Sequence, residues 1–389
     1  LGDLFKITKQ QSGTSSNNRN FILLGDPALR LAYPKLNVET ISIADTLKAL
    51  SEVQVSGQIT TNGSLASNFN GVIYPVVYDK EIIRTTLGQE SCTPMPYRDQ
   101  SNIIYKGAAS VVDGIFSFNF IVPKDIAYNY ANGKISYYAI DNQQNVIDAN
   151  GSSSDFVIGG TADNISYDYQ PADLSLFIND TLFINGGLTN QNPVLLAYIN
   201  DESGINTVGN GIGHDITAIL DGKSSNPYIL NDYYQSAQDD FTKGKIIFPM
   251  FNLTPGEHTL TLKVWDVFNN SSEETITFVV VENDLLQVDN FISYPNPFMY
   301  STDFYFEHNK SNQMIDYILN IYSVTGSLVR TIEEKSYFSQ GFRVGPINWD
   351  GRDDLGHQMS SGIYIARLNI SDQNNLFESK TARVILLPK

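Results

Sequence analysis

The sequence predicts a mainly β protein, in which three consecutive β-sandwich modules follow a short helix-strand segment. Short runs of alternating apolar and polar residues recur along the chain, as in "VQVSGQIT", and this period of two is typical of half-buried strands. Turn signals such as Asn-Gly and Asp-Gly separate the runs. The content of 22 Tyr and 21 Phe also favours strands. The length of 389 residues is enough for several domains.

Charge and cysteine content exclude several classes of protein. The formal net charge is −17, and Lys and Arg form no cluster, so a phosphate backbone would be repelled and we expect no nucleic-acid partner. The single cysteine, Cys92, excludes an internal disulfide framework. No apolar run approaches the ~20 residues that span a bilayer, so we expect no transmembrane segment. Because Leu1 rather than Met opens the sequence, we expect a piece of a longer protein.

Residues 1–37 have a pattern unlike the rest of the chain. Apolar residues at helical spacing predict a helix from Leu1 to about Gln10. The continuous apolar run Phe21–Leu24 is typical of a strand that is buried on both faces beneath helices, and a Gly-Asp-Pro turn follows it. A helix, a loop and a buried strand are typical of the last unit of an α/β domain. We expect this segment to pack on the module that follows.

Residues 38–160 form the first predicted module, module 1. Runs such as "GVIYPVVYD", "GIFSFNFIVP" and "GKISYYAID" alternate in polarity, and "TNGS" and "NYANGK" separate them as turns. This spacing is typical of an antiparallel sandwich. The small-residue tract "GSSSDFVIGGTADN" marks the boundary near residue 160.

Residues 161–284 form module 2 by the same reasoning. The alternation in "HTLTLKVWDV" places Asp266 on the same strand face as three apolar residues, Leu260, Leu262 and Val264. The pattern "LTPGEHTLTLKVWD" resembles the last hairpin of bacterial immunoglobulin-like modules. We therefore predict an immunoglobulin-like β-sandwich.

Residues 285–389 form module 3, which we predict as a third, smaller β-sandwich. It opens with "ISYPNPF" and continues with "DYILNIYSVTGSLVRTI", in which "VTGS" predicts a hairpin turn between two strands. Leu319 and Ile321 alternate with Ile318 and Asn320 along the first of these strands.

The sequence shows no catalytic or cofactor-binding constellation. Cys92 lies in the Pro-containing stretch "GQESCTPMPYRDQ" within a module that has no histidine, so we interpret it as a loop thiol rather than a nucleophile. The histidines lack metal-ligand spacing, and we interpret each as a surface or turn residue; they are His214, His258, His308 and His357. The glycines of "GNGIGHD" at 209–215 follow no strand-to-helix switch and read as a loop.

The stretch "WDGRDDLG" carries the one candidate for a metal ion. Asp350, Asp353 and Asp354 could present several oxygens to a hard cation such as calcium. The spacing differs from that of the twelve-residue calcium loop and lacks its terminal glutamate. We therefore prefer a solvated hairpin corner and predict no metal, with these aspartates as the calcium candidate.

Several stretches, taken in order, resemble one family. The stretch "NRNFILLGDPALRLAYP" resembles the end of the peptidase domain of gingipain-family cysteine peptidases, as found in the sortase of the Bacteroidetes type IX secretion system. "IIYKGAASVVDGIFSFNFIVPKDI" is similar to the module that follows there. "YPNPF", "IYSVTGSLVRTI" and "WDGRDDLG" resemble the C-terminal secretion-signal domain and the related FlgD-type fold. On this resemblance, residues 1–37 are the remnant of an α/β caspase-like peptidase domain.

The resemblance implies a parent protein that is a cysteine endopeptidase and transpeptidase on the extracellular face of the outer membrane. Such a protein removes C-terminal signal domains from secreted cargo and attaches the cargo to anionic lipopolysaccharide. Its partners are the outer-membrane β-barrel protein PorV, other cell-surface secretion components and the cargo signal domains. The family's catalytic Cys and His lie upstream of the stretch "LLGDPALRL", so no residue of this chain inherits a catalytic role, and we expect the chain alone to be inactive.

A non-catalytic region of this kind is predicted to position the peptidase and to dock on the barrel protein through module 3. We assign the docking to two stretches of module 3, which contain Tyr294, Pro295, Asn296, Pro297 and Phe298, and Trp349, Asp350 and Gly351. A strand-entry turn with rigid prolines is an equally good explanation of the first stretch. The alternative function is a surface adhesin or carbohydrate-binding cargo protein whose last module is a removable export signal.

Overall fold

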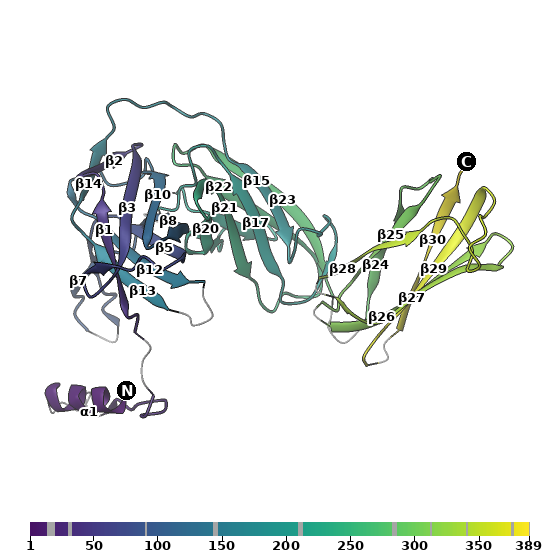
Figure 1. Cartoon of the computed structure of the whole chain (residues 1–389), viewed down its shortest axis with the longest axis horizontal. Helices are drawn as coiled ribbons and strands as arrows, with labels where there is room; N and C mark the ends of the chain where they lie inside the picture. The colour runs from purple at the N-terminus through teal and green to yellow at the C-terminus, as the bar shows by residue number, and fades with distance from the viewer. Residues whose placement is uncertain are drawn as a thin grey trace.

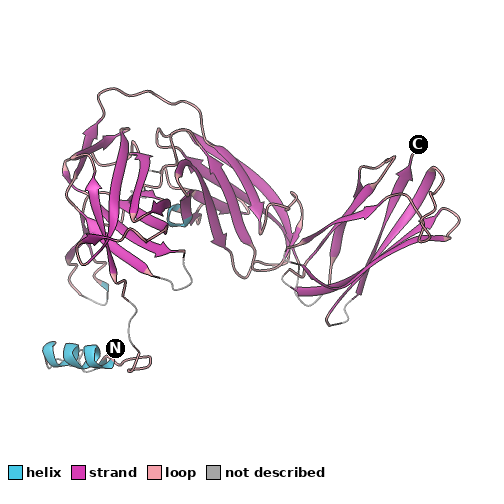
Figure 2. Cartoon of the chain, viewed as in Figure 1, coloured by secondary structure: helices cyan, strands magenta, loops and turns pink. Residues whose placement is uncertain are grey.

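The computed structural model confirms the prediction of a mainly β protein: strands follow one another along almost the whole chain (Figure 2). The structure describes residues 1–13, 20–29, 33–89, 92–142, 147–208, 213–281, 286–311, 313–339, 341–374 and 377–388. Within these ranges, no helix is both long enough and apolar enough to cross a membrane.

The N-terminal segment differs from the prediction beyond its helix. Helix α1 (Gly2–Gln11) forms as expected, but the predicted buried strand at Phe21–Leu24 is wrong. These residues pair with no strand, and the side chains of Phe21 and Leu24 are 67% and 87% exposed. A strand buried on both faces needs neighbouring strands and covering helices, and the described residues around it supply only α1. Instead, the terminal ammonium group of Leu1 donates to the carbonyl of Leu29, and the backbone N–H of Gly2 donates to the carbonyl of Pro27.

The expected packing of this segment on module 1 is also wrong, because Figure 1 shows α1 lying apart from the sheets. None of the helix residues is buried. The structure therefore gives this segment no apolar core of its own.

Module 1 contains a main sheet that closes on itself around a core, and a separate three-stranded sheet. Its strands are β1 (Leu36–Ser42), β2 (Thr46–Ala49), β3 (Glu52–Thr61), β4 (Ser64–Leu65), β5 (Gly71–Tyr78), β6 (Ile82–Thr85), β7 (Pro96–Asp99), β8 (Ile103–Lys106), β9 (Ala109–Val112), β10 (Ile115–Ile121), β11 (Ala131–Asn132), β12 (Lys134–Asp141), β13 (Asp148–Ser153) and β14 (Val157–Thr161). The main sheet has the order β1-β13-β12-β5-β9-β10-β3-β4, and β1 also pairs with β3. The main sheet closes into a ring because β1 pairs with both β13 and β3. Strands β11, β14 and β2 form the separate three-stranded sheet. A closed ring differs from the antiparallel sandwich that the sequence predicts. Strands β6 and β7 form a hairpin of their own.

The interior of module 1 is aromatic on one side. Phe116, Phe118 and Phe120 of β10 alternate with exposed or half-buried residues, and Tyr105 of β8 stacks on Phe120 with ring centroids 4.7 Å apart. Val208 of module 2 belongs to the same apolar cluster. The core of module 1 is therefore completed by a residue of its neighbour.

Module 2 has two sheets over a second core. Its elements are β15 (Asp173–Ile178), β16 (Leu188–Thr189), β17 (Val194–Asn200), β18 (Thr217–Leu220), β19 (Tyr228–Ile229), the 3₁₀ turn η2 (Asn231–Tyr233), β20 (Tyr234–Ala237), β21 (Asp240–Pro249), β22 (Gly256–Trp265) and β23 (Ser271–Val280). One sheet has the order β15-β17-β21-β20 and the other β16-β23-β22-β18-β19. The predicted face of β22 is confirmed, because Leu260, Leu262, Val264 and Asp266 are each fully buried.

Module 3 repeats this arrangement with a third core. Its strands are β24 (Val288–Tyr294), β25 (Thr302–His308), β26 (Gln313–Ser323), β27 (Leu328–Ser339), β28 (Arg343–Trp349), β29 (Gly362–Asp372) and β30 (Phe377–Leu386). The sheet orders are β24-β25-β28 and β27-β26-β29-β30. The predicted hairpin joins β26 and β27: the N–H of Ser323 donates to the carbonyl of Ser327, and Gly326 has φ +85°, which favours glycine.

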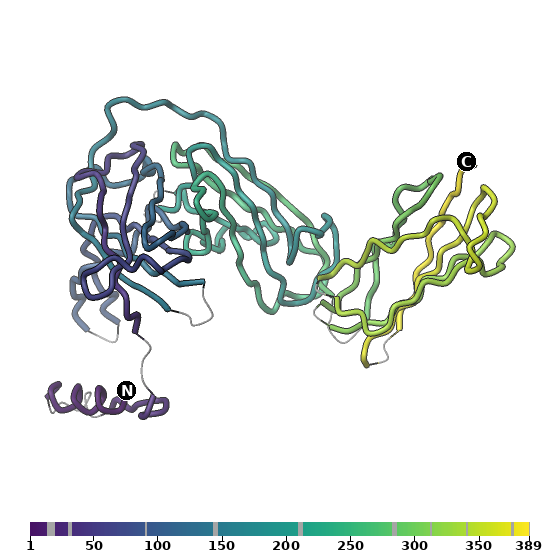
Figure 3. The backbone as a smooth tube through the Cα atoms, in the orientation of Figure 1, coloured from purple at the N-terminus to yellow at the C-terminus, as the bar shows by residue number. Residues whose placement is uncertain are grey.

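The three modules follow one another along the long axis of the molecule (Figure 3). Modules 1 and 2 are joined by many polar contacts, among them the two hydrogen bonds that Ser110 donates to the Asp239 carboxylate. Between modules 2 and 3, Glu307 of β25 accepts a hydrogen bond from the N–H of Leu188 in β16.

Replacement of a core ring should show how far module 3 depends on its own apolar cluster. Phe304 is fully buried, whereas Phe377 of the same module is 62% exposed. We expect Phe304→Ala to lower the free energy of unfolding by about 3–5 kcal/mol, and the control Phe377→Ala to change it by less than about 0.5 kcal/mol. Urea unfolding followed by tryptophan fluorescence measures both, since Trp349 lies in this core. Equal effects of the two substitutions would contradict the assignment of this core.

Candidate functional site

The predicted docking residues come together in module 3, but several of them are interior. Phe298 and Trp349 are 2% and 1% exposed, and their rings lie 5.3 Å apart. Gly351 is buried as well. Asn296 is held by the backbone of β30, because its amide donates to the carbonyl of Arg383 and accepts from the N–H of Ile385. Exposed surface is left to Tyr294, Pro295, Asn296, Pro297 and Asp350.

The three aspartates of the calcium candidate face separate partners. Asp353 accepts from the N–H groups of Leu355 and His357. Asp354 accepts from the N–H of Thr331 and lies 3.7 Å from the Arg330 guanidinium. Asp350 accepts from the N–H of Arg352. These contacts make a hydrogen-bonded corner, and the choice between a solvated corner and a calcium site stays a prediction.

Cysteine and histidine side chains form no nucleophile-base pair among the described residues. Cys92 is exposed and free. The interpretation of every histidine as a surface or turn residue is wrong for His258 and His308, which are 6% and 0% exposed. His308 accepts from the N–H of Lys310 at Nδ1, so its Nε2 donates to Ser339 Oγ, 2.8 Å away. This tautomer cannot accept a proton from the serine, and the pair is structural.

Most of the loop 209–215 lies outside the described residues, so the interpretation of its glycines stays a prediction. His214 next to it is described. Its Nδ1 lies 2.7 Å from an Asp125 carboxylate oxygen.

A buried cluster of three carboxylates is the feature that sequence reasoning missed. Asp168, Asp201 and Asp266 are 9%, 5% and 0% exposed, and one oxygen from each lies within 4.8 Å of the others. Asp201 directly follows β17 and Asp266 directly follows β22, while Asp168 comes from the chain that leads into β15. Among the described residues this is the one group of acidic, His or Cys side chains that the fold gathers at metal-ligand spacing.

The cluster is held by neutral donors rather than by cations. Ser203 donates its hydroxyl to Asp168 and its N–H to Asp201. Asp266 accepts from the N–H groups of Phe268 and Asn270. No Lys, Arg or His within the described ranges pairs with any of the three carboxylates.

Burial without a counter-charge changes the acidity of this cluster. Burial, and then the neighbouring Asp266 and Asp168 carboxylates, raise the pKa of Asp201 to about 7. Burial also raises the pKa of Asp266. The oxygens could coordinate a hard cation or share protons near neutral pH. The hydrogen bonds described above are all within the protein and point to no particular ion.

One signal in the sequence does mark this cluster. The alternation of β22 places Asp266 on the apolar face, and a charged residue at a core position is unusual enough to need an explanation. Asp168 lies in irregular chain and Asp201 lies just past the end of β17, so their approach to Asp266 depends on tertiary structure.

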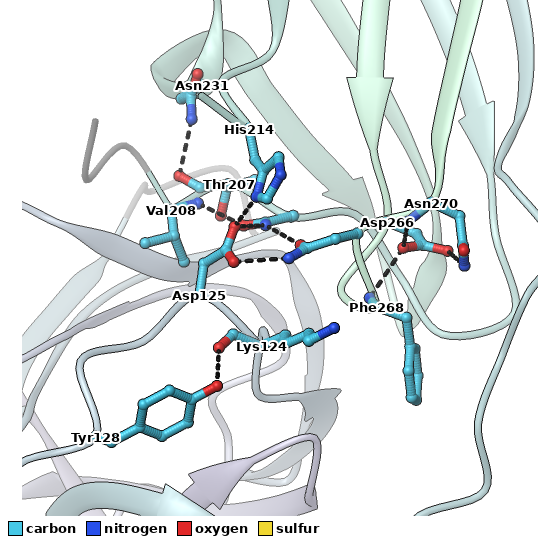
Figure 4. A network of polar contacts seen from close by, with 12 residues as sticks. Lys124, Asp125, Tyr128, Thr207, Val208, His214, Asn231, Asp266, Phe268 and Asn270 are labelled. Carbon is cyan, nitrogen blue, oxygen red and sulfur yellow. Dashed lines mark hydrogen bonds and ion pairs between the residues drawn. The ribbon is translucent and has the colours of Figure 1, made fainter. Parts of the chain in front are cut away.

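A second polar centre holds modules 1 and 2 together. Asp125 of module 1 accepts hydrogen bonds from the side-chain amides of Asn206 and Asn269, at 2.7 and 2.8 Å, and contacts His214. Figure 4 shows this network, with Asp266 and Asn270 beside it. Asp125 is 7% exposed, so each of these donors loses water when it binds the carboxylate.

Comparison with known proteins places the chain beside several solved structures. No family model matches the chain, and no curated protein matches it. The chain is similar to the solved structure of dimeric latent PorU from Porphyromonas gingivalis, with 30% identity over 94% of this chain and 35% of that chain, and a TM-score of 0.40. It therefore spans about a third of the PorU chain.

Two further solved structures are much more distant. A tetra-tandem repeat from the extending region of a large adhesion protein has 11% identity over 91% of this chain and 74% of that chain, with a TM-score of 0.20. SGBP-B of the Bacteroides ovatus mixed-linkage glucan utilization locus has 10% identity over 91% and 70%, with a TM-score of 0.25. Neither match supports a statement about function.

The carboxylate cluster predicts a pH dependence of stability. A carboxyl whose pKa is higher in the folded state binds protons more tightly there, so stability rises as the pH falls from about 7 toward the unfolded value near 4. We expect a gain of up to about 4 kcal/mol from Asp201. Urea unfolding between pH 8 and 5, with EDTA present, measures the part of this gain that develops above pH 5. Burial lowers the pKa of His308 to about 4, so His308 contributes a slope of the opposite sign in this range, and the contribution of Asp201 is the difference between the unchanged chain and Asp201→Asn. Asp201→Asn keeps the oxygen that accepts from Ser203 and should lose the gain at low pH; an unchanged slope would contradict this origin.

The junction network predicts a large effect of removing one carboxylate. Asp125→Ala leaves its buried donors without a partner, and we expect the free energy of unfolding to fall by about 2–4 kcal/mol. Asp163→Ala is the control, since the Asp163 side chain is 84% exposed in a surface pair with Lys48, and it should cost less than about 0.5 kcal/mol. Urea unfolding compares them. Similar midpoints would show that Asp125 does not stabilise the junction.

Proposed function

We propose that this chain is the non-catalytic C-terminal region of a PorU-like cell-surface sortase. The observation that carries the proposal is the 30% identity to PorU, which extends over 94% of the chain. A match restricted to module 3 would support only a secretion-signal module, whereas this match includes all the modules.

The structure is compatible with a supporting region that positions a peptidase domain. Each of the three apolar clusters is formed mainly by one group of strands, and the described residues contain no Cys-His pair. We propose that the boundaries are 1–37 for the peptidase remnant, 38–160 and 161–284 for two sandwich modules, the second immunoglobulin-like, and 285–389 for a type IX secretion C-terminal domain. Cleavage of cargo and its attachment to anionic lipopolysaccharide would then belong to a peptidase domain outside this sequence.

Docking on the outer-membrane barrel protein PorV is assigned to the exposed part of the predicted stretches. Tyr294 is 73% exposed, and Asp350 is exposed beside the buried Trp349. An aromatic ring on an exposed turn is an efficient contact for a partner protein. Phe298, Trp349 and Gly351 would support this surface from within.

The proposal predicts an intact C-terminus on a membrane-bound complex. The full-length parent protein, tagged in an internal loop, should be recovered from the outer membrane with residues 285–389 uncleaved and with a PorV-type barrel bound. Affinity purification and intact mass measurement test both points. The double substitution Tyr294→Ala and Asp350→Ala should lower recovery of the barrel, and Phe338→Ala on the exposed part of β27 should not. A C-terminus trimmed near residue 285, with no barrel bound, would make the protein secreted cargo instead.

A further inference from the structure

A cleft of about 800 Å³ lies between modules 1 and 2. Module 1 contributes β6, the residues before β8 and the loop after Asp125, and module 2 contributes β19 and η2. Figure 4 shows part of its wall, with Asp125, Thr207 and Asn231 around the junction. A volume of this size at a boundary between modules is typical of ligand sites.

The charge of this cleft is unbalanced. Its acidic lining residues are Asp79, Glu81, Asp125, Asp215 and Asp232, and its basic ones are Lys80 and Arg84. Both bases are already paired, Lys80 with Asp79 at 2.8 Å and Arg84 with Asp99. Asp215 and Asp232 have no ion pair with any described residue, although the carbonyl of Asp232 accepts from Lys106. The cleft therefore favours a positively charged occupant.

Apolar side chains and strand edges in the cleft indicate which kind of positively charged ligand fits it. Isoleucines lie among the charges, at positions 82, 103, 126 and 229. Among the described strands, β6 pairs only with β7, and β19 is the last strand of its sheet. Each has an edge with free backbone groups, which an extended peptide can pair with while its alternate side chains enter a pocket. A small cation would use the charge of the cleft but not these edges or the isoleucines.

We infer that this cleft binds an extended polypeptide segment in which Lys or Arg alternates with aliphatic residues. The aliphatic side chains contact the isoleucines, and the basic side chains pair with Asp215 and Asp232. The inference depends on the cleft alone and not on the proposed sortase function.

The test uses the full chain and a labelled six-residue peptide of alternating valine and lysine. Fluorescence anisotropy should show saturable binding in the micromolar range, and a matched valine-glutamate peptide should not bind. The double substitution Asp215→Asn and Asp232→Asn should weaken binding about three- to tenfold, because two partly exposed charge pairs are lost. Glu333→Gln with Glu334→Gln, on the exposed part of β27, makes the same change in net charge and should leave binding unchanged.

A second variant tests the place of binding. Ile229 is 51% exposed in the cleft wall, and Ile229→Lys should abolish binding by adding a positive charge there without disturbing the core. Circular dichroism verifies that each variant is folded. Equal binding of the two peptides, or equal weakening by the cleft and the β27 variants, would overturn the inference, as would the absence of binding.

Discussion

The rest of the structure depends on one constraint: a chain with a single cysteine must bury one face of each of its larger sheets without the help of disulfides. Alternate side chains of β10, β22 and β26 point inward, and each group of strands closes over them to form one of three apolar clusters. Because burial of apolar area is the main source of stability, each cluster makes its own group of strands compact. The junctions between the groups are then left to polar contacts, where stability depends on whether each buried group finds a partner.

The junction of modules 1 and 2 and the junction of modules 2 and 3 differ in how their buried polar groups are paired. At the first, the Asp125 carboxylate binds two amide groups and a histidine, and Val208 crosses into the core of module 1. At the second, Glu307 accepts from Leu188 and Asn290 through one oxygen, while its other oxygen is buried without a partner. Burial raises the pKa of Glu307 accordingly. An unsatisfied buried oxygen costs free energy, whereas both oxygens of Asp125 accept hydrogen bonds.

Local pattern was sufficient to predict most of the strands, but not what depends on distant neighbours. The faces of β22 and the turn after β26 follow from alternation and turn chemistry, and both were predictable. Phe21–Leu24 has the pattern of a buried strand, yet its burial depends on partners that the described chain does not supply. The ring in module 1 depends on β1 pairing with both β13 and β3, which no local pattern specifies. The carboxylate cluster joins residues from separate parts of the chain, and only Asp266 carried a local signal.

The buried aspartates of module 2 lower the stability of the fold, so a requirement for stability does not explain why they are there. Three carboxylates without a cationic partner lower the stability at neutral pH, and the unpaired Asp215 and Asp232 add to the negative charge of the nearby cleft. Apolar or amide side chains at the three buried positions would make module 2 more stable at neutral pH. Departures from local consistency of this kind are concentrated at functional sites. The junction of modules 1 and 2, rather than the well-satisfied corner at Asp350–Asp354, is therefore where binding beyond a supporting role is to be expected.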